Sequence, residues 1–222
     1  MKTIYVGFVG KGNCGKGTQA KILAEKYNLQ IISTGSMLRE WTAKDPNNFW
    51  SQKLNHDIDN GFLVPSAIVF YLWFSKLLSF DSNQGVVFEG GPRMLIEGQA
   101  MHEVFKWMDN NQFLVFNLNI PDEESFTRST NRRYCQTCHK TYSLAFDPGI
   151  AHCKDDQTEL IIRDDDKPEV IKRRIDEFNK LVVPTIDFLR NQGVLYDING
   201  VGPVEEIAKN IDKIIKDLIN QQ

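Results

Sequence analysis

The feature that most constrains the fold is a glycine loop near the N-terminus, which reads GFVGKGNCGKGTQAK over residues 7–21. It contains the spacing Gly10-x4-Gly15-Lys16, and it lies between a β-rich apolar run at 3–9 and a helical pattern. Glycines allow backbone N–H groups to face phosphate oxygens, and the helix N-terminus adds partial positive charge. A lysine at this position bridges the terminal phosphates. The loop therefore predicts a strand–loop–helix unit that binds a nucleotide phosphate.

Two features of the loop leave alternatives open. The usual pattern has Ser or Thr directly after the lysine, whereas here Gly17 intervenes before Thr18. The competing interpretation is a glycine-rich turn without a ligand, which the strand–loop–helix context disfavours. Cys14 also lies within the loop, where it either fills space or, with a pKa lowered by the helix N-terminus, acts as a redox switch. We favour the packing role.

The rest of the chain alternates short apolar runs with helical patterns. Alternation of this kind predicts an α/β fold with a parallel sheet. Apolar runs lie at 29–32, 85–88, 113–120 and 194–198, and helical patterns lie near 16–27, 35–44, 65–79, 97–109, 122–132, 167–190 and 203–220.

Composition excludes several classes of protein. A chain of 222 residues can form one sizeable domain with a small insertion, and its net charge of −3 gives no support for nucleic acid or an anionic membrane as partner. The apolar run at 66–80 is too short to span a membrane and contains Lys76. The N-terminal run lacks a cleavage site for export, which predicts a cytoplasmic protein in which disulfides are disfavoured.

Residues 134–162 interrupt the alternation and contain three of the four cysteines. About thirty residues without a long helix or buried strand cannot build a core unaided, so the segment is either stapled or disordered. The spacing Cys135-x2-Cys138-x14-Cys153-x2-Asp156 is typical of a closed tetrahedral zinc site. We therefore predict structural zinc.

Other interpretations of these cysteines remain. A disulfide framework would leave one cysteine over, and redox chemistry at C-x-x-C would leave Cys153 unexplained. The C-x-x-C-H string also matches a haem attachment signal, although no export route is visible, and a zinc knuckle for nucleic acid lacks a matching basic excess. The fourth ligand is open among His139, His152, Asp155 and Asp156, of which the spacing favours Asp156.

The string GKGT in the loop resembles that of the adenylate kinase family of nucleoside-monophosphate kinases. In that family the loop commonly reads G-x-P-G-x-G-K-G-T, and here Gly12 and Asn13 replace the Pro-Gly pair. Asn tolerates a left-handed backbone better than most residues, so the cradle can survive the change. The strings ISTGSMLRE (32–40), DNGFLVP (59–65), EGGPR (89–93) and IIRDDDKPEVIKRRIDEF (161–178) extend the resemblance over nearly the whole chain.

The resemblance implies a fold and a domain organisation. The fold is a P-loop NTPase-like three-layer α/β/α core with a five-stranded parallel sheet, built from residues 1–32, 65–126 and 164–222. A helical flap at 33–64 would bind the acceptor nucleotide, and a zinc-binding lid of the long type would span 127–163.

The resemblance also implies roles for individual residues. Positive charge on the reacting phosphates would come from Lys16, Arg93, Arg132, Arg163 and Arg174, with Glu89 near the hydration shell of Mg²⁺. The donor ATP would contact Asn13, Cys14, Gly15, Lys16, Gly17, Thr18, Arg128, Arg132, Thr141, Tyr142 and Gly202. The acceptor AMP would contact Thr34, Arg39, Phe62, Leu63, Val64, Gly90, Gly91, Pro92, Arg93, Glu97, Arg163 and Arg174. Zinc would be held by Cys135, Cys138, Cys153 and Asp156.

The implied activity is ATP + AMP ⇌ 2 ADP, with Mg²⁺ and structural Zn²⁺, in a monomer that needs no nucleic acid or membrane. Phosphoryl transfer requires positioning, charge neutralisation and exclusion of water by closing flaps, and no general base is assigned. Asp165 and Asp166 either assist closure of the lid or are solvated surface groups. Several residues depart from the family pattern, namely Gly12, Asn13, Glu89, Gly91, Gly202 and Glu97, which replaces a base-reading glutamine.

These departures leave three alternatives. Glu97 suggests a kinase for another nucleoside monophosphate, such as UMP, CMP or GMP, because a carboxylate accepts from an exocyclic amine but donates to no ring nitrogen. The departures together suggest a catalytically weakened nucleotide-binding or regulatory protein. A zinc-ribbon module for nucleic acid is the third alternative, which the net charge disfavours.

Overall fold

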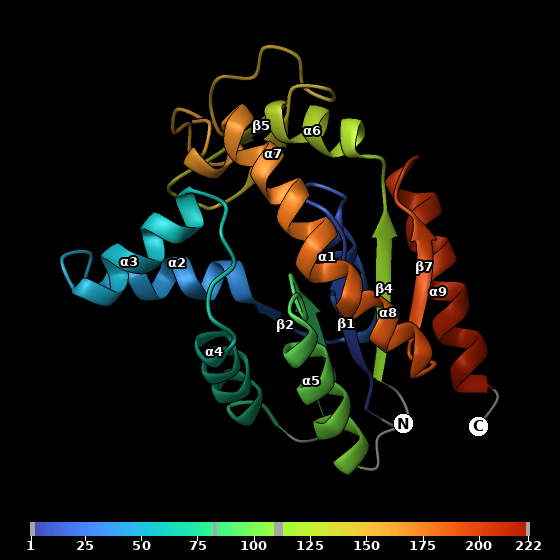
Figure 1. Cartoon of the computed structure of the whole chain (residues 1–222). Helices are drawn as coiled ribbons and strands as arrows, with labels where there is room; N and C mark the ends of the chain where they lie inside the picture. Colours follow the sequence, from blue (N-terminus) through green and yellow to red (C-terminus); the bar gives the residue numbers. More distant parts are fainter. Residues whose placement is uncertain (1–2, 82–83, 109–112, 221–222) are drawn as a thin grey trace.

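A five-stranded parallel sheet forms the centre of the computed structural model, which describes residues 3–81, 84–108 and 113–220. Its strand order is β2-β3-β1-β4-β7, with helices on both faces (Figure 1). The predicted three-layer α/β fold with a five-stranded parallel sheet is confirmed. The strands are β1 (Tyr5–Val9), β2 (Gln30–Ser33), β3 (Val86–Glu89), β4 (Phe113–Asn119) and β7 (Leu195–Asn199).

Two apolar clusters cover the two faces of the sheet, because successive side chains of a strand point to opposite faces. On one face Val6 and Phe8 pack against α1 (Lys16–Tyr27) and α9 (Val204–Asn220). On the other face Tyr5 and Val9 pack against α4 (Ser66–Leu78), α5 (Leu95–Trp107) and α8 (Val183–Asn191). A sheet covered in this way presents the carboxyl ends of its strands as the open edge for a ligand.

The segment 33–64, predicted to form a helical flap, contains one helix that the sequence did not predict. The pattern near 35–44 corresponds to α2 (Thr34–Lys44), but α3 (Phe49–Asp59) was missed. In α3 only Ser51 and Leu54 are buried, so the helix has little of the apolar periodicity that indicates a buried face. Its N-terminus is capped by Asn48, whose side-chain oxygen accepts from the Trp50 N–H at 2.8 Å.

The helix predicted at 167–190 is continuous but changes its geometry in the middle. It consists of α7 (Pro168–Glu177), a π-helical turn (Phe178–Val182) and α8. Pro184 near the start of α8 has no N–H to donate to the preceding turn, and the widened turn lies directly before it. The helix predicted at 97–109 corresponds to α5; its last predicted residue, 109, lies outside the described part of the chain.

The segment at 134–162 contains no long helix or long strand among the described residues, as predicted. After α6 (Asp122–Thr130) the chain forms a short antiparallel pair, β5 (Arg132–Tyr134) and β6 (Thr141–Ser143). A 3-10 turn at Asp164–Asp166 then leads into α7. No helix in the described part of the chain is long and apolar enough to cross a membrane.

Candidate functional site

The glycine loop connects the carboxyl end of β1 to α1, which begins at Lys16. Gly10 has a φ of 140°, and a Cβ there would lie 2.7 Å from Cys14 Sγ and from the Leu118 carbonyl oxygen, so only glycine fits. Gly15 has a φ of 104° and Asn13 a φ of 55°. Asn13 therefore adopts the left-handed backbone that its residue type tolerates.

Lys16 extends across this loop. Its Nζ donates to the carbonyl oxygens of Gly10 at 2.8 Å and Lys11 at 2.7 Å. Cys14 is 1% exposed and packs in the cluster beneath α1 and α9, as its packing interpretation requires. The ammonium group of Lys16 thus lies inside the curve of the loop, where a bound phosphate would attract it.

Three arginines from separate segments converge on two buried aspartates. Arg132, at the start of β5, donates through Nε and Nη2 to Asp166 at 2.6 and 2.7 Å. Arg163 and Arg174 both donate to Asp165 Oδ2, at 2.7 and 2.8 Å. Asp165 is 6% exposed and Asp166 is 2% exposed, so neither is a solvated surface group.

Charge is unbalanced at this cluster. Burial lowers the pKa of Arg163, and the neighbouring Arg132 lowers it further. Burial alone would raise the pKa of Asp165, but Arg174, Arg163 and Arg132 outweigh it and lower that pKa. Arg39 also acts on Asp165 and Arg93 acts on Arg174, whereas the exposed Asp59 adds a carboxylate near Arg163, so five guanidinium groups surround three carboxylates among the described residues. Such a surplus attracts an anion such as phosphate.

Two residues predicted from the family resemblance, Glu89 for Mg²⁺ and Arg39 for the acceptor phosphate, lie near the carboxyl ends of β2 and β3. Glu89 accepts from the Ser33 hydroxyl at 2.5 Å, and its Oε1 lies 3.9 Å from the position of a Cβ on Gly17. Arg39 lies beside Gly35, 3.3 Å from the position of a Cβ there, and its pKa is lowered by burial and then by Arg163. Glu89 therefore faces the start of α1, and Arg39 shares the electrostatic environment of the arginine cluster.

Residues 90–93 form the loop after β3. Gly90, Gly91 and Pro92 are buried, and Arg93 Nε donates to the Gly90 carbonyl oxygen at 2.8 Å. Thr34 Oγ1 is 3.8 Å from the position of a Cβ on Gly91, with no other atom of the described residues within 4 Å of it. A Cβ at position 91 would consequently make only an ordinary van der Waals contact with Thr34.

Glu97 is 2% exposed and its carboxylate is engaged within the protein. Oε2 accepts from the backbone N–H groups of Arg93 at 2.8 Å and Met94 at 3.3 Å, while Oε1 accepts from the Ser66 hydroxyl at 2.9 Å. The side chain thereby satisfies N–H groups before α5 and connects the start of α5 to the start of α4. Its residue type is explained by this local role.

Several predicted site residues lie away from the cluster or have other partners. Arg128 pairs with Glu124 on α6 at 2.6 Å, and the Tyr142 hydroxyl lies 3.3 Å from Cys153 Sγ. Of the other residues predicted for ATP, Thr18 and Thr141 are exposed, and Gly202 lies in the exposed loop before α9. Of those predicted for AMP, Phe62 lies under the Arg173 guanidinium, Leu63 is half-buried, and Val64 is buried in the core.

The cysteine segment brings four potential ligands together. The ligand atoms of Cys135, Cys138, Cys153 and Asp156 all lie within 4.8 Å of one another. The Sγ atoms of Cys138 and Cys153 are 3.5 Å apart and unbonded, close to the separation of about 3.8 Å that two thiolates have around a tetrahedral zinc. The set fits zinc in number, residue type and spacing, and it could hold one ion.

The alternative fourth ligands have other positions. His139 Nδ1 lies 2.6 Å from the Tyr134 hydroxyl and the two rings stack, while Asp155 pairs with Lys140. His152 is exposed and forms an isolated backbone bridge with Glu159. Asp156 alone of these candidates joins the cysteine cluster.

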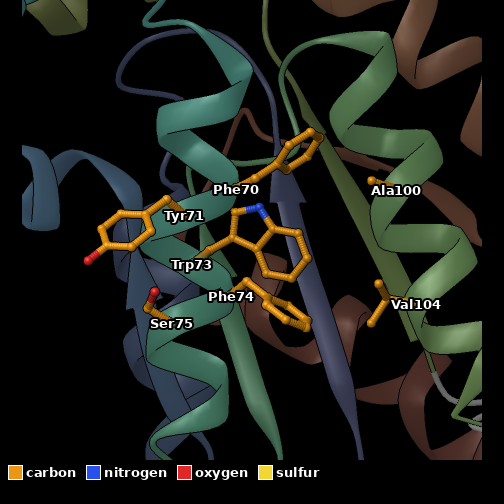
Figure 2. Close-up of a pocket in the computed structure, with 7 residues that line it drawn as sticks. All are labelled: Phe70, Tyr71, Trp73, Phe74, Ser75, Ala100 and Val104. Atoms are coloured by element: carbon orange, nitrogen blue, oxygen red, sulfur yellow. The ribbon is translucent and has the colours of Figure 1, made fainter.

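An apolar pocket between α4 and α5 is separate from these sites. Figure 2 shows Phe70, Trp73 and Phe74 of α4 facing Ala100 and Val104 of α5. None of the predicted nucleotide or metal residues lines it. The pocket lacks the cationic and glycine-loop groups that phosphate binding requires, so it is not the candidate site.

Some residues of the site were not identified from the sequence. Ser33 precedes α2 and accepts from the Ser36 N–H, a capping position that a Ser before a helical pattern could have indicated. Ser66 and Ser129 carry no such signal, because their partners lie 31 and 116 residues away in the chain.

Comparisons with known proteins agree with this geometry. A family model described as adenylate kinase matches residues 8–194. Curated proteins named adenylate kinase resemble the chain: that of Archaeoglobus fulgidus is 36% identical over 94% of this chain and 96% of its own length. The protein of Lachnospira eligens is 34% identical over 97% of this chain and 100% of its own length. The protein of Mesomycoplasma hyopneumoniae is 36% identical over 93% of this chain and 95% of its own length. The chain belongs to the adenylate kinase family of enzymes.

Proposed function

We propose that this chain transfers the terminal phosphoryl group of ATP to AMP, giving two ADP. The observation that carries the proposal is the approach of the arginine cluster to the glycine loop. Arg174 Nη2 lies 3.8 Å from the position of a Cβ on Gly12, and Arg132 donates to the Asn13 side chain at 3.0 Å. The glycine loop, which would bind the donor phosphates, and the arginines that would neutralise the transferring phosphoryl group therefore lie next to each other.

We assign each residue a role in phosphoryl transfer from its position relative to the glycine loop. The loop N–H groups and Lys16 would hold the donor phosphates, with Arg132 beside them. Arg39 and Arg93 would hold the acceptor phosphate, and Arg163 and Arg174 would neutralise charge on the group in transit. Bound Mg²⁺ supplies further charge neutralisation on the phosphates, and Glu89, which faces the start of α1, would hold its hydration shell.

Exclusion of water is the second requirement, because water competes for the phosphoryl group. We assign this to two moving parts, the flap at 33–64 and the lid at 127–163, on a core of 1–32, 65–126 and 164–222 that acts as a monomer. Asp165 would assist closure of the lid by holding Arg163 from the lid boundary and Arg174 from α7 together. Structural zinc on Cys135, Cys138, Cys153 and Asp156 would keep the lid folded while it moves.

The acceptor base is the least constrained part of the proposal. Glu97 has no N–H to donate, and its carboxylate already accepts from three groups. Any contact that it makes with a base is consequently as an acceptor, from the exocyclic amine of adenine, cytosine or guanine or from the ring N–H of guanine or uracil. The runner-up is a kinase for CMP, GMP or UMP, which the engaged carboxylate of Glu97 leaves open.

A coupled assay of the purified protein with ATP, Mg²⁺ and a panel of AMP, CMP, UMP and GMP tests the proposal. We expect the highest kcat/KM with AMP. A higher value with another monophosphate would establish the runner-up. No turnover with any acceptor, alongside intact ATP binding, would overturn the enzyme proposal in favour of a regulatory nucleotide-binding protein.

The donor site has its own test in Lys16→Ala. Removing the ammonium group from the reacting phosphates should lower kcat by at least about a hundredfold while the protein stays folded. The matched control is Lys21→Ala, an exposed lysine on the same helix, which should keep normal turnover. Near-normal turnover of Lys16→Ala would contradict the assignment of the donor site.

A further inference from the structure

The side chain of Asn13 connects the glycine loop to the arginine cluster. Its Oδ1 accepts from Arg132 Nη1 at 3.0 Å, and its Nδ2 donates to Ser129 Oγ at 2.8 Å. Ser129 is 3% exposed, and its hydroxyl donates to the Ser125 carbonyl oxygen of α6 at 2.7 Å. A chain of hydrogen bonds therefore runs from α6 through the loop to an arginine at the start of the lid strands.

The backbone and the side-chain amide of Asn13 are both held in place by the surrounding residues. Its backbone has a φ of 55°, a region that few residues other than Gly, Asn and Asp adopt readily. The carbonyl oxygen of the preceding residue, Gly12, accepts from the Ser125 hydroxyl at 2.8 Å. The amide group is consequently held at a defined position relative to the loop, and its orientation is set by one donor and one acceptor.

Arg132 has five N–H groups, and three of them are used within the protein. Nε and one N–H of Nη2 bind Asp166, and one N–H of Nη1 binds Asn13. Asp166 alone fixes one edge of the guanidinium plane, and Asn13 adds a second point of attachment on another nitrogen. Nη2 also forms an ion pair with Asp165 Oδ1 at 3.7 Å, which is too long for a hydrogen bond, so one N–H on each terminal nitrogen remains for a phosphate oxygen.

We propose that Asn13 is a positioning residue, whose amide holds the Arg132 guanidinium against the glycine loop with two N–H groups free for the phosphates. The inference rests on the proposed phosphoryl transfer. It assigns to Asn13 a side-chain role in addition to its backbone place in the loop. Glycine at this position would provide the same backbone conformation without the second attachment of Arg132.

The test is Asn13→Gly, which removes the amide while suiting the positive φ. We expect kcat to fall about tenfold, as for one lost hydrogen bond to a charged group, with the KM for AMP changed by less than about twofold. The matched control is Asn28→Gly, because Asn28 has a φ of 52° and is exposed at the end of α1. Asn28→Gly should leave both constants unchanged.

A double-mutant cycle with Arg132→Lys separates positioning from a structural role. Lysine keeps the charge but lacks the planar fork, so Asn13→Gly should change kcat by less than about twofold in that background. An equal tenfold loss in both backgrounds would show that Asn13 does not act through Arg132. Ser129→Ala removes the acceptor of the Asn13 amide and leaves the loop backbone intact, and it should lower kcat about threefold in the Arg132 background but not in the Arg132→Lys background. This variant provides the test if Asn13→Gly fails to fold.

The failures of the two proposals are distinguishable. Absence of turnover by the unmodified protein with any acceptor would overturn phosphoryl transfer and the positioning role with it. Normal turnover by the unmodified protein, together with unchanged kcat in Asn13→Gly and Ser129→Ala, would overturn the positioning role alone.

Discussion

The segment predicted to form a lid, 127–163, and the central sheet are stabilised in different ways. The sheet lies between two large apolar clusters, in which Val6, Phe8, Val86 and Val115 are almost fully buried. The predicted lid segment has a small cluster, whose buried members among the described residues are Cys135, Cys153 and Leu160. Two of those three are potential metal ligands. The small apolar cluster of this segment is therefore made largely of the residues that could hold a metal.

This difference determines what each region can do. A sheet covered on both faces gains its stability from burial of apolar area, which fixes the glycine loop and the starts of helices in place. A segment with a minimal core would gain its stability from metal coordination instead, and we expect it to move as a unit without exposing a core. Loss of the metal should consequently unfold the lid and leave the sheet intact.

Chelation gives the largest expected effect, because metal coordination in small zinc domains is worth on the order of 10 kcal/mol. Metal analysis of the purified protein should find about one zinc per chain, from four ligands in tetrahedral geometry. After chelation, amide hydrogens of 132–143 should exchange fully within seconds, while those of β1 and β4 stay protected. Hydrogen exchange read by mass spectrometry measures both regions at once.

The control for chelation is re-addition of zinc, which should restore protection and turnover together. Cys138→Ser should reproduce the chelated state without a chelator. A protein that contains no metal and yet protects the lid amides would refute the role of zinc as a staple.

The second test perturbs the core of the sheet and leaves the metal ligands intact: Ile211→Ala on α9 creates a cavity in the apolar cluster. Ile211 is 1% exposed, and truncation of such a residue costs about 2–5 kcal/mol, which lowers Tm by about 10 °C in a chain of this size. Zinc content should not change. Ile219→Ala, on the same helix at 39% exposure, is the control and should cost less than about 1 kcal/mol. Loss of zinc in folded Ile211→Ala protein would show that the two regions are not independent.

The smallest effect concerns a charged group on the surface of the core. Asp212 accepts from Lys26, Lys216 and Tyr27 at 2.7–2.9 Å. Burial opposes ionisation of Asp212, but these partners outweigh it and lower its pKa to about 2, against about 3.9 in an unfolded chain. A carboxyl with a lowered folded-state pKa stabilises the protein above pH ~4, and this contribution is lost as pH falls through pH ~2.

Asp212→Asn should therefore lower the free energy of unfolding by about 1 kcal/mol at pH 7, and the difference should shrink towards zero near pH 2. Urea unfolding at several pH values measures it. The exposed Asp217 on the same helix provides the control, Asp217→Asn, which should change little. A deficit in Asp212→Asn that stays constant down to pH 2 would contradict the electrostatic explanation.

Much of the fold was predictable because its signals are local. The glycine loop identified β1 and α1, and apolar runs identified the other four strands of the sheet. The flap helix α3 was missed because its buried face has only Ser51 and Leu54, and the π-helical turn at Phe178–Val182 has no periodicity of its own. Roles for Glu97, Asp165 and Asp166 could not be derived from spacing, since their partners depend on how separate segments pack.

The sequence by itself determined the residue types suited to phosphate and metal, because glycine spacing, cysteine spacing and strand–helix alternation act over a few neighbouring positions. Only the tertiary structure decided how those groups meet. It placed Asn13 between Ser129 and Arg132, removed Asp165 from solvent, and used the Glu97 carboxylate at the start of α5. Hydrogen bonds and ion pairs act over a few ångströms in space, and residues far apart in the chain reach that distance only after the core has packed.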